Sequence, residues 1–246
     1  MILIIPDIHG RPFWKKAVEE NMDKVDKIIF LGDYLDPYPW ENITRKDAIR
    51  NFDEIIKFKA DNKEKVTLLL GNHDFPYIDK KLFYTRSRYD SSNAYHIEEM
   101  FRSHRSLFQL ADETKVGDKA YLFTHAGLMP LWYEKHKDLI GGLTVRNLNH
   151  LYEIPGGIKS LCEASYYRGG WDQIGSIVWC DVNEMAEETQ HSKEVEGLSV
   201  NDKLPWDYQV FGHSQQEEHP IITKEFACLD CRKAFLLTDE GGFQEC

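Results

Sequence analysis

The sequence predicts a protein of the α/β class, on three observations. Short runs rich in Ile, Val and Leu, typical of buried strands, alternate with longer stretches whose apolar residues recur at helical spacing. The chain has 246 residues, enough for one large α/β domain or two small ones. Its 42% hydrophobic and 29% charged content is typical of a globular protein.

The expected strands are apolar runs that end in polar or glycine-containing turns. The principal strands are expected at residues 2–5, 27–31, 66–70, 120–123 and 208–211. Further strands are expected at residues 174–180, 225–229 and 233–237. If the principal strands belong to one sheet, their carboxyl ends lie along one edge, where open α/β sheets bind ligands.

The helices are predicted from apolar stripes and from residues typical of helix starts. Residues 12–24 form the first stripe, and Thr44 followed by Asp47 resembles the start of a second helix. A third helix is expected to begin after Asn93 and to extend through Leu107 and Phe108. We expect a single domain, residues 1–246, with a mostly helical insertion or cap at about residues 128–172 and a polar helix and loop at 183–203.

Charge and cysteine content restrict the possible partners and compartment. The net charge of −11 argues against a protein that grips a nucleic-acid backbone, but not against a phosphorylated substrate, because bound metal ions can reverse the local charge. No stretch has the length to span a membrane. Five cysteines without a tight framework indicate a reducing cytoplasm. Cys228 and Cys231 have the spacing of a C-x-x-C motif, but no second pair completes a zinc site, so we interpret them as part of a strand and its end.

A side chain that can bind a metal follows each of the principal strands. These side chains are Asp7 and His9, then Asp33, Asn72, His125 and His213. Any one of them also fits an ordinary strand-ending turn, but their recurrence favours a shared site. The mixture of oxygen and imidazole ligands suits Mn²⁺, Fe or Zn²⁺ better than Ca²⁺ or a thiolate zinc site. The set exceeds the needs of one ion, so we expect two divalent ions that share a bridging carboxylate.

The motifs that carry these residues occur in a characteristic order. They are Asp-x-His-Gly from Asp7, Gly-Asp-x-x-Asp from Gly32, Gly-Asn-His-Asp from Gly71, His-Ala-Gly from His125 and Gly-His at 212–213. The series resembles the calcineurin-like metallophosphoesterase superfamily, and particularly its phosphoprotein phosphatases and their bacterial and phage relatives, which include diadenosine tetraphosphatases. The resemblance implies an α+β sandwich of mixed β-sheets flanked by helices, with a dinuclear metal site at the strand carboxyl ends.

The resemblance also implies a role for each matched residue. Asp7 and His9 would hold the first metal, Asp33 would bridge both metals, and Asn72, His125 and His213 would hold the second. Mn²⁺ is the expected metal, with Fe, Zn²⁺ or Ni²⁺ as alternatives. A hydroxide between the metals would attack phosphorus. His73 would not be a ligand but would protonate the leaving alkoxide, and Asp36 would orient it.

The sequence departs from the family pattern at the groups that contact phosphate. Gln215 stands where many members have a second histidine, and Pro37 stands where the phosphoprotein phosphatases have an arginine. A second clamp arginine is also missing from the stretch before His213. Arginine is the preferred bidentate partner of phosphate. The candidates to replace these groups are Arg86, Arg88 and Arg168, each of which could instead lie on the surface.

The leading functional prediction is a phosphoesterase acting on phosphate monoesters, either of a Ser/Thr phosphoprotein or of a small molecule. A diadenosine polyphosphate or phosphodiester hydrolase is the alternative, because aromatic residues of the insertion could stack on a nucleobase. A non-catalytic scaffold that keeps the fold is a third reading, and the intact ligand positions argue against it. The sequence indicates a phosphorylated substrate and no membrane partner, and gives no indication of oligomeric state.

Overall fold

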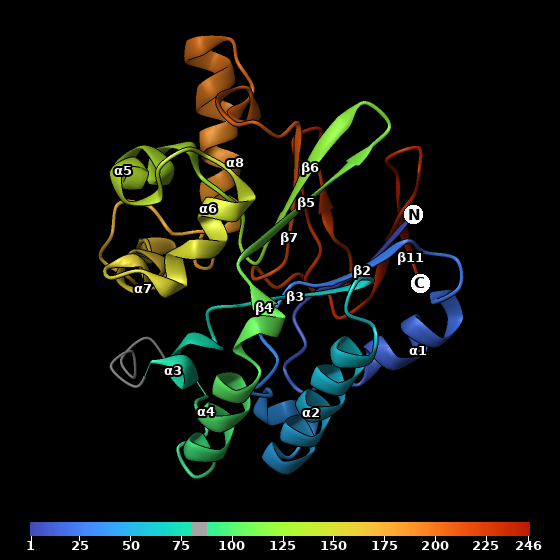
Figure 1. Cartoon of the computed structure of the whole chain (residues 1–246). Coiled ribbons are helices and arrows are strands. Elements are labelled where there is room, and N and C mark those ends of the chain that lie inside the picture. The colour runs from blue at the N-terminus through green and yellow to red at the C-terminus, as the bar shows by residue number, and fades with distance from the viewer. Residues whose placement is uncertain (80–87) are drawn as a thin grey trace. The chain divides into compact units, whose positions relative to one another are not determined.

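The computed structural model, shown in Figure 1, describes residues 1–79 and 88–246 and divides into two compact units. Unit 1 comprises Met1–Gln109 and Arg232–Cys246, and unit 2 comprises Leu110–Cys231. Each unit has its own sheet, so the expectation that the principal strands share one sheet is wrong. The prediction of α/β architecture with mixed sheets flanked by helices is confirmed. The single domain with a cap at about residues 128–172 stays a prediction.

The sheet of unit 1 has a parallel centre and an antiparallel edge. Its strand order is β11-β10-β1-β2-β3-β4. The strands are β1 Ile2–Ile5, β2 Lys27–Phe30, β3 Val66–Leu69, β4 Phe108–Gln109, β10 Phe235–Leu237 and β11 Phe243–Glu245. β1 to β4 are mutually parallel, whereas β10 pairs antiparallel with β1 and β11 antiparallel with β10. β1 and β3 are buried along their whole length, as expected for central parallel strands.

The helices of unit 1 follow the predicted apolar stripes. They are α1 Phe13–Asn21, α2 Arg45–Asp61, α3 Phe75–Ile78 and α4 Ala94–Ser103, with 3₁₀ turns at Pro39–Glu41 and Arg105–Leu107. α1 packs on β1 and α2 on β3. The predicted start of α2 is confirmed, because the Thr44 side chain accepts a hydrogen bond from the Asp47 N–H. Aromatic side chains fill the core beneath the sheet, with Trp14 against Phe30 and Tyr34 stacked on Phe52.

The helix expected to extend through Leu107 and Phe108 ends earlier, at Ser103. Leu107 belongs to the 3₁₀ turn, and Phe108 opens the short strand β4. Phe108 pairs in register with Leu68 of β3. The apolar residues Leu107 and Phe108 fit the helical spacing only by chance. The sequence could not show this, because β4 forms by pairing with β3, a distant part of the chain.

The sheet of unit 2 has the order β5-β6-β7-β9-β8. Its strands are β5 Ala111–Val116, β6 Lys119–Thr124, β7 Tyr208–Phe211, β8 Ile221–Ile222 and β9 Phe226–Cys228. β6, β7 and β9 are parallel, and the outer strands β5 and β8 are antiparallel to their neighbours. The sequence did not predict β5, because polar residues dominate it. It forms a hairpin with β6 in which Val116 pairs with Lys119.

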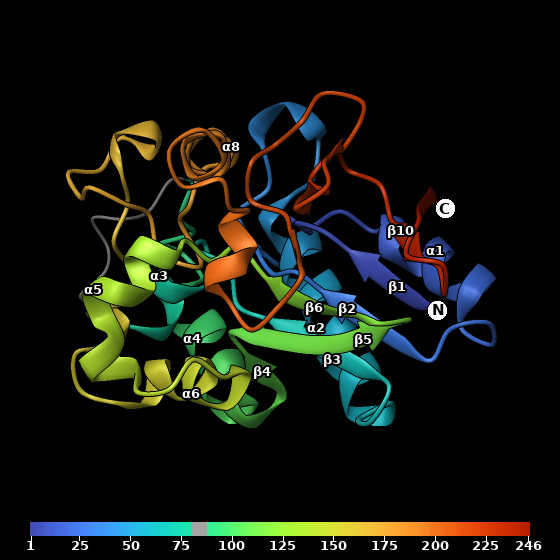
Figure 2. The same cartoon turned by 90° about the horizontal axis from the view of Figure 1, so that it is seen from above.

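The helices of unit 2 are α5 Pro130–Ile140, α6 Val145–His150, α7 Gly157–Leu161 and α8 Val182–His191. Short helical turns are found at Leu151–Glu153, Tyr166–Arg168, Ser192–Glu196 and Val200–Lys203. Figures 1 and 2 show α5, α6 and α8 to one side of β5 and β6. The mostly helical character predicted for residues 128–172 is confirmed, and α8 begins in a capping box formed by Asp181 and Glu184.

The strand predicted at residues 174–180 is wrong. This apolar stretch is a buried turn in which the N–H groups of Trp179 and Cys180 donate to the Ser176 carbonyl. Its burial explains why its composition resembles that of a strand. Within residues 1–79 and 88–246, no helix has the length and apolar character that crossing a bilayer requires.

Candidate metal centre

The loops after β1 and β2 run side by side at the carboxyl edge of the unit 1 sheet. The His9 N–H donates to the Asp33 carbonyl at 2.7 Å, and the Gly10 N–H donates to the Tyr34 carbonyl at 3.0 Å. His9 and Asp33 are each 2% exposed, so both residues are shielded from solvent. Parallel neighbouring strands thus bring together two predicted ligands from distant parts of the sequence.

The backbone at these strand ends adopts a conformation that side chains normally avoid. His9, Asp33 and Asp36 have φ angles of 44°, 54° and 60°, in the left-handed region. This conformation costs roughly 1–2 kcal/mol for a residue with a Cβ atom. Residues held in such conformations cluster at functional sites, where the surrounding structure imposes them.

Asp74 holds the strand-end loops in this arrangement, a role that the sequence did not reveal. Its buried carboxylate accepts the N–H groups of Gly71 at 2.8 Å, Asp33 at 3.0 Å and Tyr34 at 3.2 Å. Burial, followed by the charge of Asp33, raises the pKa of Asp74. The loops pass so close that a Cβ atom on Gly71 would lie 2.7 Å from the Asp33 nitrogen, so only glycine fits there.

His9 presents a nitrogen lone pair to Asp33. Its Nδ1 lies 2.9 Å from the Leu35 carbonyl and therefore carries the proton, which leaves Nε2 as an acceptor. Nε2 lies 3.5 Å from Asp33 Oδ2. Burial lowers the pKa of His9 well below its usual value and favours the neutral ring. Two acceptors facing each other at this distance fit a cation that binds both.

His73 lies beside this pair and is hydrogen-bonded to Asp36, and its role as an acid stays a prediction. Ligand atoms of His9, Asp33 and His73 all lie within 4.8 Å of one another. The His73 Nδ1 is 2.9 Å from Asp36 Oδ2. Burial lowers the pKa of His73, but the charge of Asp33 and the hydrogen bond to Asp36 raise it more, so the net pKa is raised. His73 thus donates through Nδ1 to the Asp36 carboxylate, and its raised pKa favours the protonated ring.

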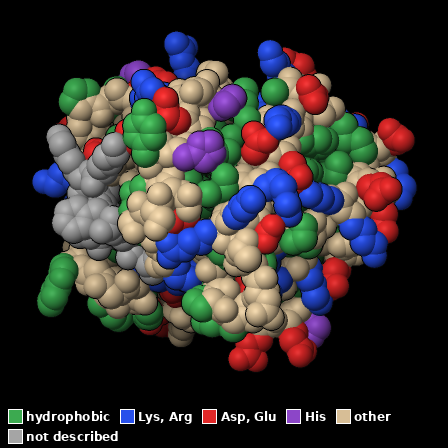
Figure 3. Space-filling view, turned by 90° about the horizontal axis from the view of Figure 1, so that it is seen from below, with side chains coloured by type: hydrophobic (Ala, Val, Ile, Leu, Met, Phe, Trp, Pro, Cys, Tyr) green, Lys and Arg blue, Asp and Glu red, His purple; other side chains and the backbone are tan. Residues whose placement is uncertain are grey.

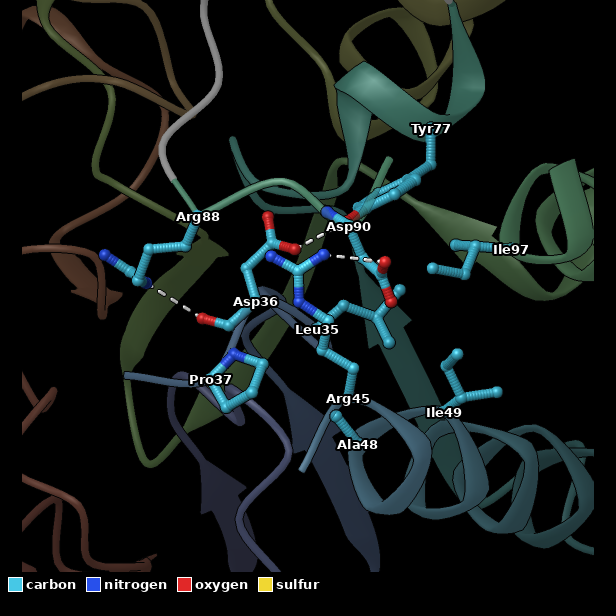
Figure 4. A pocket seen from close by; sticks show the side chains of 10 residues that line it. All are labelled: Leu35, Asp36, Pro37, Arg45, Ala48, Ile49, Tyr77, Arg88, Asp90 and Ile97. Carbon is cyan, nitrogen blue, oxygen red and sulfur yellow. Dashed lines mark hydrogen bonds and ion pairs between the residues drawn. The ribbon is translucent and has the colours of Figure 1, made fainter. Parts of the chain in front are cut away.

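The candidate Arg88 lies next to His73. Its Nε donates to the Asp36 carbonyl at 2.9 Å, and its Nη2 is 3.4 Å from His73 Nε2. The guanidinium lies over the Tyr38 ring, 3.8 Å from the ring centre. Figure 4 shows Arg88 and Asp36 from close by. Arg86, the neighbouring candidate, lies outside the described residues.

Asp7 and Asn72 follow β1 and β3 and are 1% and 5% exposed. Their strands are the neighbours of β2 in the sheet, which places all the predicted ligands of unit 1 at the ends of adjacent parallel strands.

The two predicted histidines of unit 2 face each other. They follow the parallel neighbours β6 and β7, and the Gly212 N–H donates to the His125 carbonyl at 2.8 Å. His125 Nε2 and His213 Nδ1 are 3.1 Å apart. His213 has a left-handed backbone, with φ of 63°, as the strand-end residues of unit 1 do. Trp179, in the buried turn, packs edge-on against the His213 ring at 5.8 Å between ring centres.

Arg168 is engaged by other residues of unit 2. Its Nε lies 2.8 Å from Asp181 Oδ2, and its Nη2 donates to Ser214 Oγ at 2.6 Å and to the His213 carbonyl at 3.2 Å. Arg168 therefore holds the loop that follows β7, at His213 and Ser214, in place. Gln215 lies in the same loop, two residues after His213.

Comparisons with known proteins agree with this geometry. The family model described as calcineurin-like phosphoesterase matches residues 1–216. A cold-active protein tyrosine phosphatase of known structure is 15% identical, with a TM-score of 0.58 over 99% of this chain and 78% of that one. A hypothetical protein from Pyrococcus horikoshii is 10% identical, with a TM-score of 0.50 over 100% of this chain and 87% of that one. At these identities the likeness concerns the fold alone. No curated protein matches the sequence significantly.

Proposed function

Because the chain belongs to the calcineurin-like phosphoesterase family, and is therefore a metal-dependent hydrolase of phosphoric esters, we propose that it acts on phosphate monoesters. The substrate would be a Ser/Thr phosphoprotein or a small molecule. The observation that carries this proposal is the buried pair of His73 and Asp36. An alkoxide is a poor leaving group and gains from a proton donor, whereas a nucleotide phosphate leaves more readily without one.

The family uses a dinuclear divalent metal site, and the donor set in unit 1 fits a cation. We propose Mn²⁺ in both positions, with Fe, Zn²⁺ or Ni²⁺ as alternatives, because the donors are carboxylate, amide and imidazole. The proposed ligands are Asp7 and His9 for one ion, Asp33 for both, and Asn72, His125 and His213 for the other. When bound, such ions supply a water-derived nucleophile at neutral pH and neutralise charge on the phosphoryl oxygens.

His73 and Arg88 provide two donors that converge on one position. With Nδ1 bound to Asp36, a protonated His73 directs its Nε2 proton toward the space that Arg88 Nη2 also faces, and the two nitrogens are 3.4 Å apart. Arg88 Nη2 faces Nε2 as its acceptor when the His73 ring is neutral, whereas the protonated ring and the guanidinium repel each other unless an anion accepts from both. We propose that the phosphoryl group binds there, with Arg88 on a phosphoryl oxygen and His73 donating to the leaving oxygen. Arg88 would then replace the missing clamp arginine at position 37.

Replacing Arg88 with alanine should lower kcat/KM for a phosphate monoester by roughly 10- to 100-fold, which corresponds to one hydrogen bond between charged groups. Metal content should not change, because Arg88 contacts Asp36 through its backbone carbonyl. Arg102→Ala is the matched control, since Arg102 is exposed on α4 and pairs with Glu99. Steady-state kinetics on the two variants check this, and equal rates for Arg88→Ala and wild type would exclude a role in binding phosphate.

The proposed function is tested with a panel of substrates on metal-loaded protein. The panel contains an alkyl phosphate, an aryl phosphate, a phosphopeptide, an aryl phosphodiester and a dinucleoside polyphosphate. We expect the protein to hydrolyse the monoesters. A chelator should remove roughly 90% of the rate or more, because the nucleophile depends on bound metal, and adding Mn²⁺ should restore it. Activity on none of them with both ions bound would favour a non-catalytic scaffold.

A diadenosine polyphosphate or phosphodiester hydrolase is the second candidate, favoured by exposed aromatic rings in unit 2. Tyr166 is 68% exposed and Trp171 is 101% exposed, and both lie in the segment that Arg168 ties to the His213 loop. Exposed aromatic rings of this kind stack on nucleobases. Preference for the dinucleoside polyphosphate in the panel would select this candidate.

We propose no nucleic-acid backbone partner, in keeping with the net charge of −11 and with the mixture of acidic and basic side chains on the face shown in Figure 3. A cytoplasmic location stays a prediction from the cysteine pattern.

A further inference from the structure

We propose that Tyr77 is a positioning residue for the His73–Asp36 pair, a role that deepens the proposed function and rests on it. The Tyr77 hydroxyl contacts Asp36 and Asp90, neither of which is a predicted metal ligand. It acts through Asp36, by fixing the plane of the carboxylate that orients His73.

The Tyr77 hydroxyl is held between two groups of unit 1. It donates to Asp36 Oδ1 at 2.5 Å and accepts the N–H of Asp90 at 2.7 Å. The side chain is fully buried, and its ring stacks on Tyr89 with ring centres 4.6 Å apart. Figure 4 shows Tyr77, Asp36 and Asp90 converging on the lining of a small cavity.

Asp36 needs this second contact because its carboxylate would otherwise be free to rotate. The outer torsion of an aspartate side chain is broad, so a single hydrogen bond does not fix the carboxylate plane. His73 occupies Oδ2 and Tyr77 occupies Oδ1, so each oxygen has a donor. A buried carboxylate that loses one of its donors is left with an uncompensated desolvation cost. Tyr77 therefore fixes the plane of the Asp36 carboxylate and supplies the donor for its second oxygen.

The direction of the Tyr77 proton is set by Asp90. Because the Asp90 N–H occupies an acceptor position on the hydroxyl oxygen, the hydroxyl proton is available to Asp36. Asp90 is itself held by Arg45 Nη1 at 2.7 Å and by Asn93 Nδ2 at 2.6 Å. Burial and the charge of Asp36 raise the pKa of Tyr77, so it stays a donor at neutral pH. A continuous set of contacts thus leads from the first residue of α2 to His73.

The test compares Tyr77→Phe with wild type on an alkyl phosphate and on p-nitrophenyl phosphate. We expect kcat for the alkyl ester to fall about tenfold with little change in KM, and kcat for the aryl ester to fall less than about threefold, because the aryl leaving group needs little protonation. In a His73→Ala background, Tyr77→Phe should have no further effect on kcat. Tyr208→Phe is the control, since it removes the hydroxyl of another buried tyrosine, which donates to the Thr223 carbonyl in unit 2.

Three outcomes would overturn the inference. They are an unchanged kcat for Tyr77→Phe, an equal loss on both esters, and a loss that adds fully to that of His73→Ala. If Tyr77→Phe fails to fold, Arg45→Ala decides the matter, because the Arg45 side chain is 49% exposed and its Nη1 donates to Asp90. It should lower kcat for the alkyl ester about two- to threefold, with the same preference between esters. Wild-type protein without esterase activity would refute the proposed function itself.

Discussion

Replacing Asp33 with asparagine should lower kcat/KM on any phosphoester by on the order of 10³-fold, and should lower the metal content of the protein. Asp33 Oδ2 lies 3.5 Å from the acceptor nitrogen of His9, and its Oδ1 accepts the His73 N–H at 2.9 Å. An amide in this place has less negative charge and can turn an NH₂ group toward the cation. Elemental analysis by mass spectrometry and steady-state kinetics on the same preparation measure both effects.

The matched control for this variant is Asp53→Asn, which removes the carboxylate that pairs with Lys57 on the surface of α2. It should change neither the metal content nor the rate, because exposed ion pairs contribute little. An Asp33→Asn variant that keeps its metals and its rate would show that this carboxylate is not a ligand, and the metal centre proposed here would be wrong.

Replacing His73 with alanine should leave the metals bound and lower kcat on an alkyl phosphate by roughly 10²- to 10⁴-fold. The loss on p-nitrophenyl phosphate should be much smaller, because its leaving group needs little protonation. Kinetics on both esters, together with the metal content, separate an acid from a ligand. His96→Ala is the control, since His96 is exposed on α4.

The metal content of His73→Ala is informative because the structure places a His73 nitrogen within 4.8 Å of ligand atoms of His9 and Asp33. A variant that loses metal would make His73 a ligand and would leave the leaving group without an assigned proton donor. A variant that keeps its metals and loses equally on both esters would give His73 a role in binding the phosphoryl group instead.

The strand ends were predictable because the information is local. An apolar run followed at once by a chelating side chain marks Asp7, His9 and Asp33, and the structure places these residues after β1 and β2. The hydrogen bond between His73 and Asp36 was also predicted, but from the family motif. Neither position reveals it alone, because 37 residues separate them.

The division into two sheets could not be predicted in the same way. Pairing partners are chosen by contacts between distant segments, and the polar strand β5 and the two-residue strand β4 have no pattern of their own. The stretch at residues 174–180 shows the converse, since its apolar composition reflects burial in a turn rather than a strand.

Asp74 and Tyr77 were missed because each acts through a tertiary contact. Asp74 accepts the N–H of Asp33, 41 residues away, and Tyr77 donates to Asp36, also 41 residues away. Asp74 closes the Gly-Asn-His-Asp motif and Tyr77 lies three residues beyond it, and the motif pattern assigned neither of them a role. Arg88 was named from its charge, and only the structure distinguishes it, next to His73, from Arg168, which pairs with Asp181.

Asp36 contacts both Tyr77 and Arg88, the two residues that bound residues 78–87. The Tyr77 hydroxyl binds its carboxylate, and the Arg88 guanidinium binds its carbonyl. Lengthening a loop whose ends are fastened costs only about 0.6 kcal/mol for each doubling. We therefore expect insertions between Tyr77 and Arg88 to leave both contacts of Asp36 in place, and with them the hydrogen bond that Asp36 makes to His73.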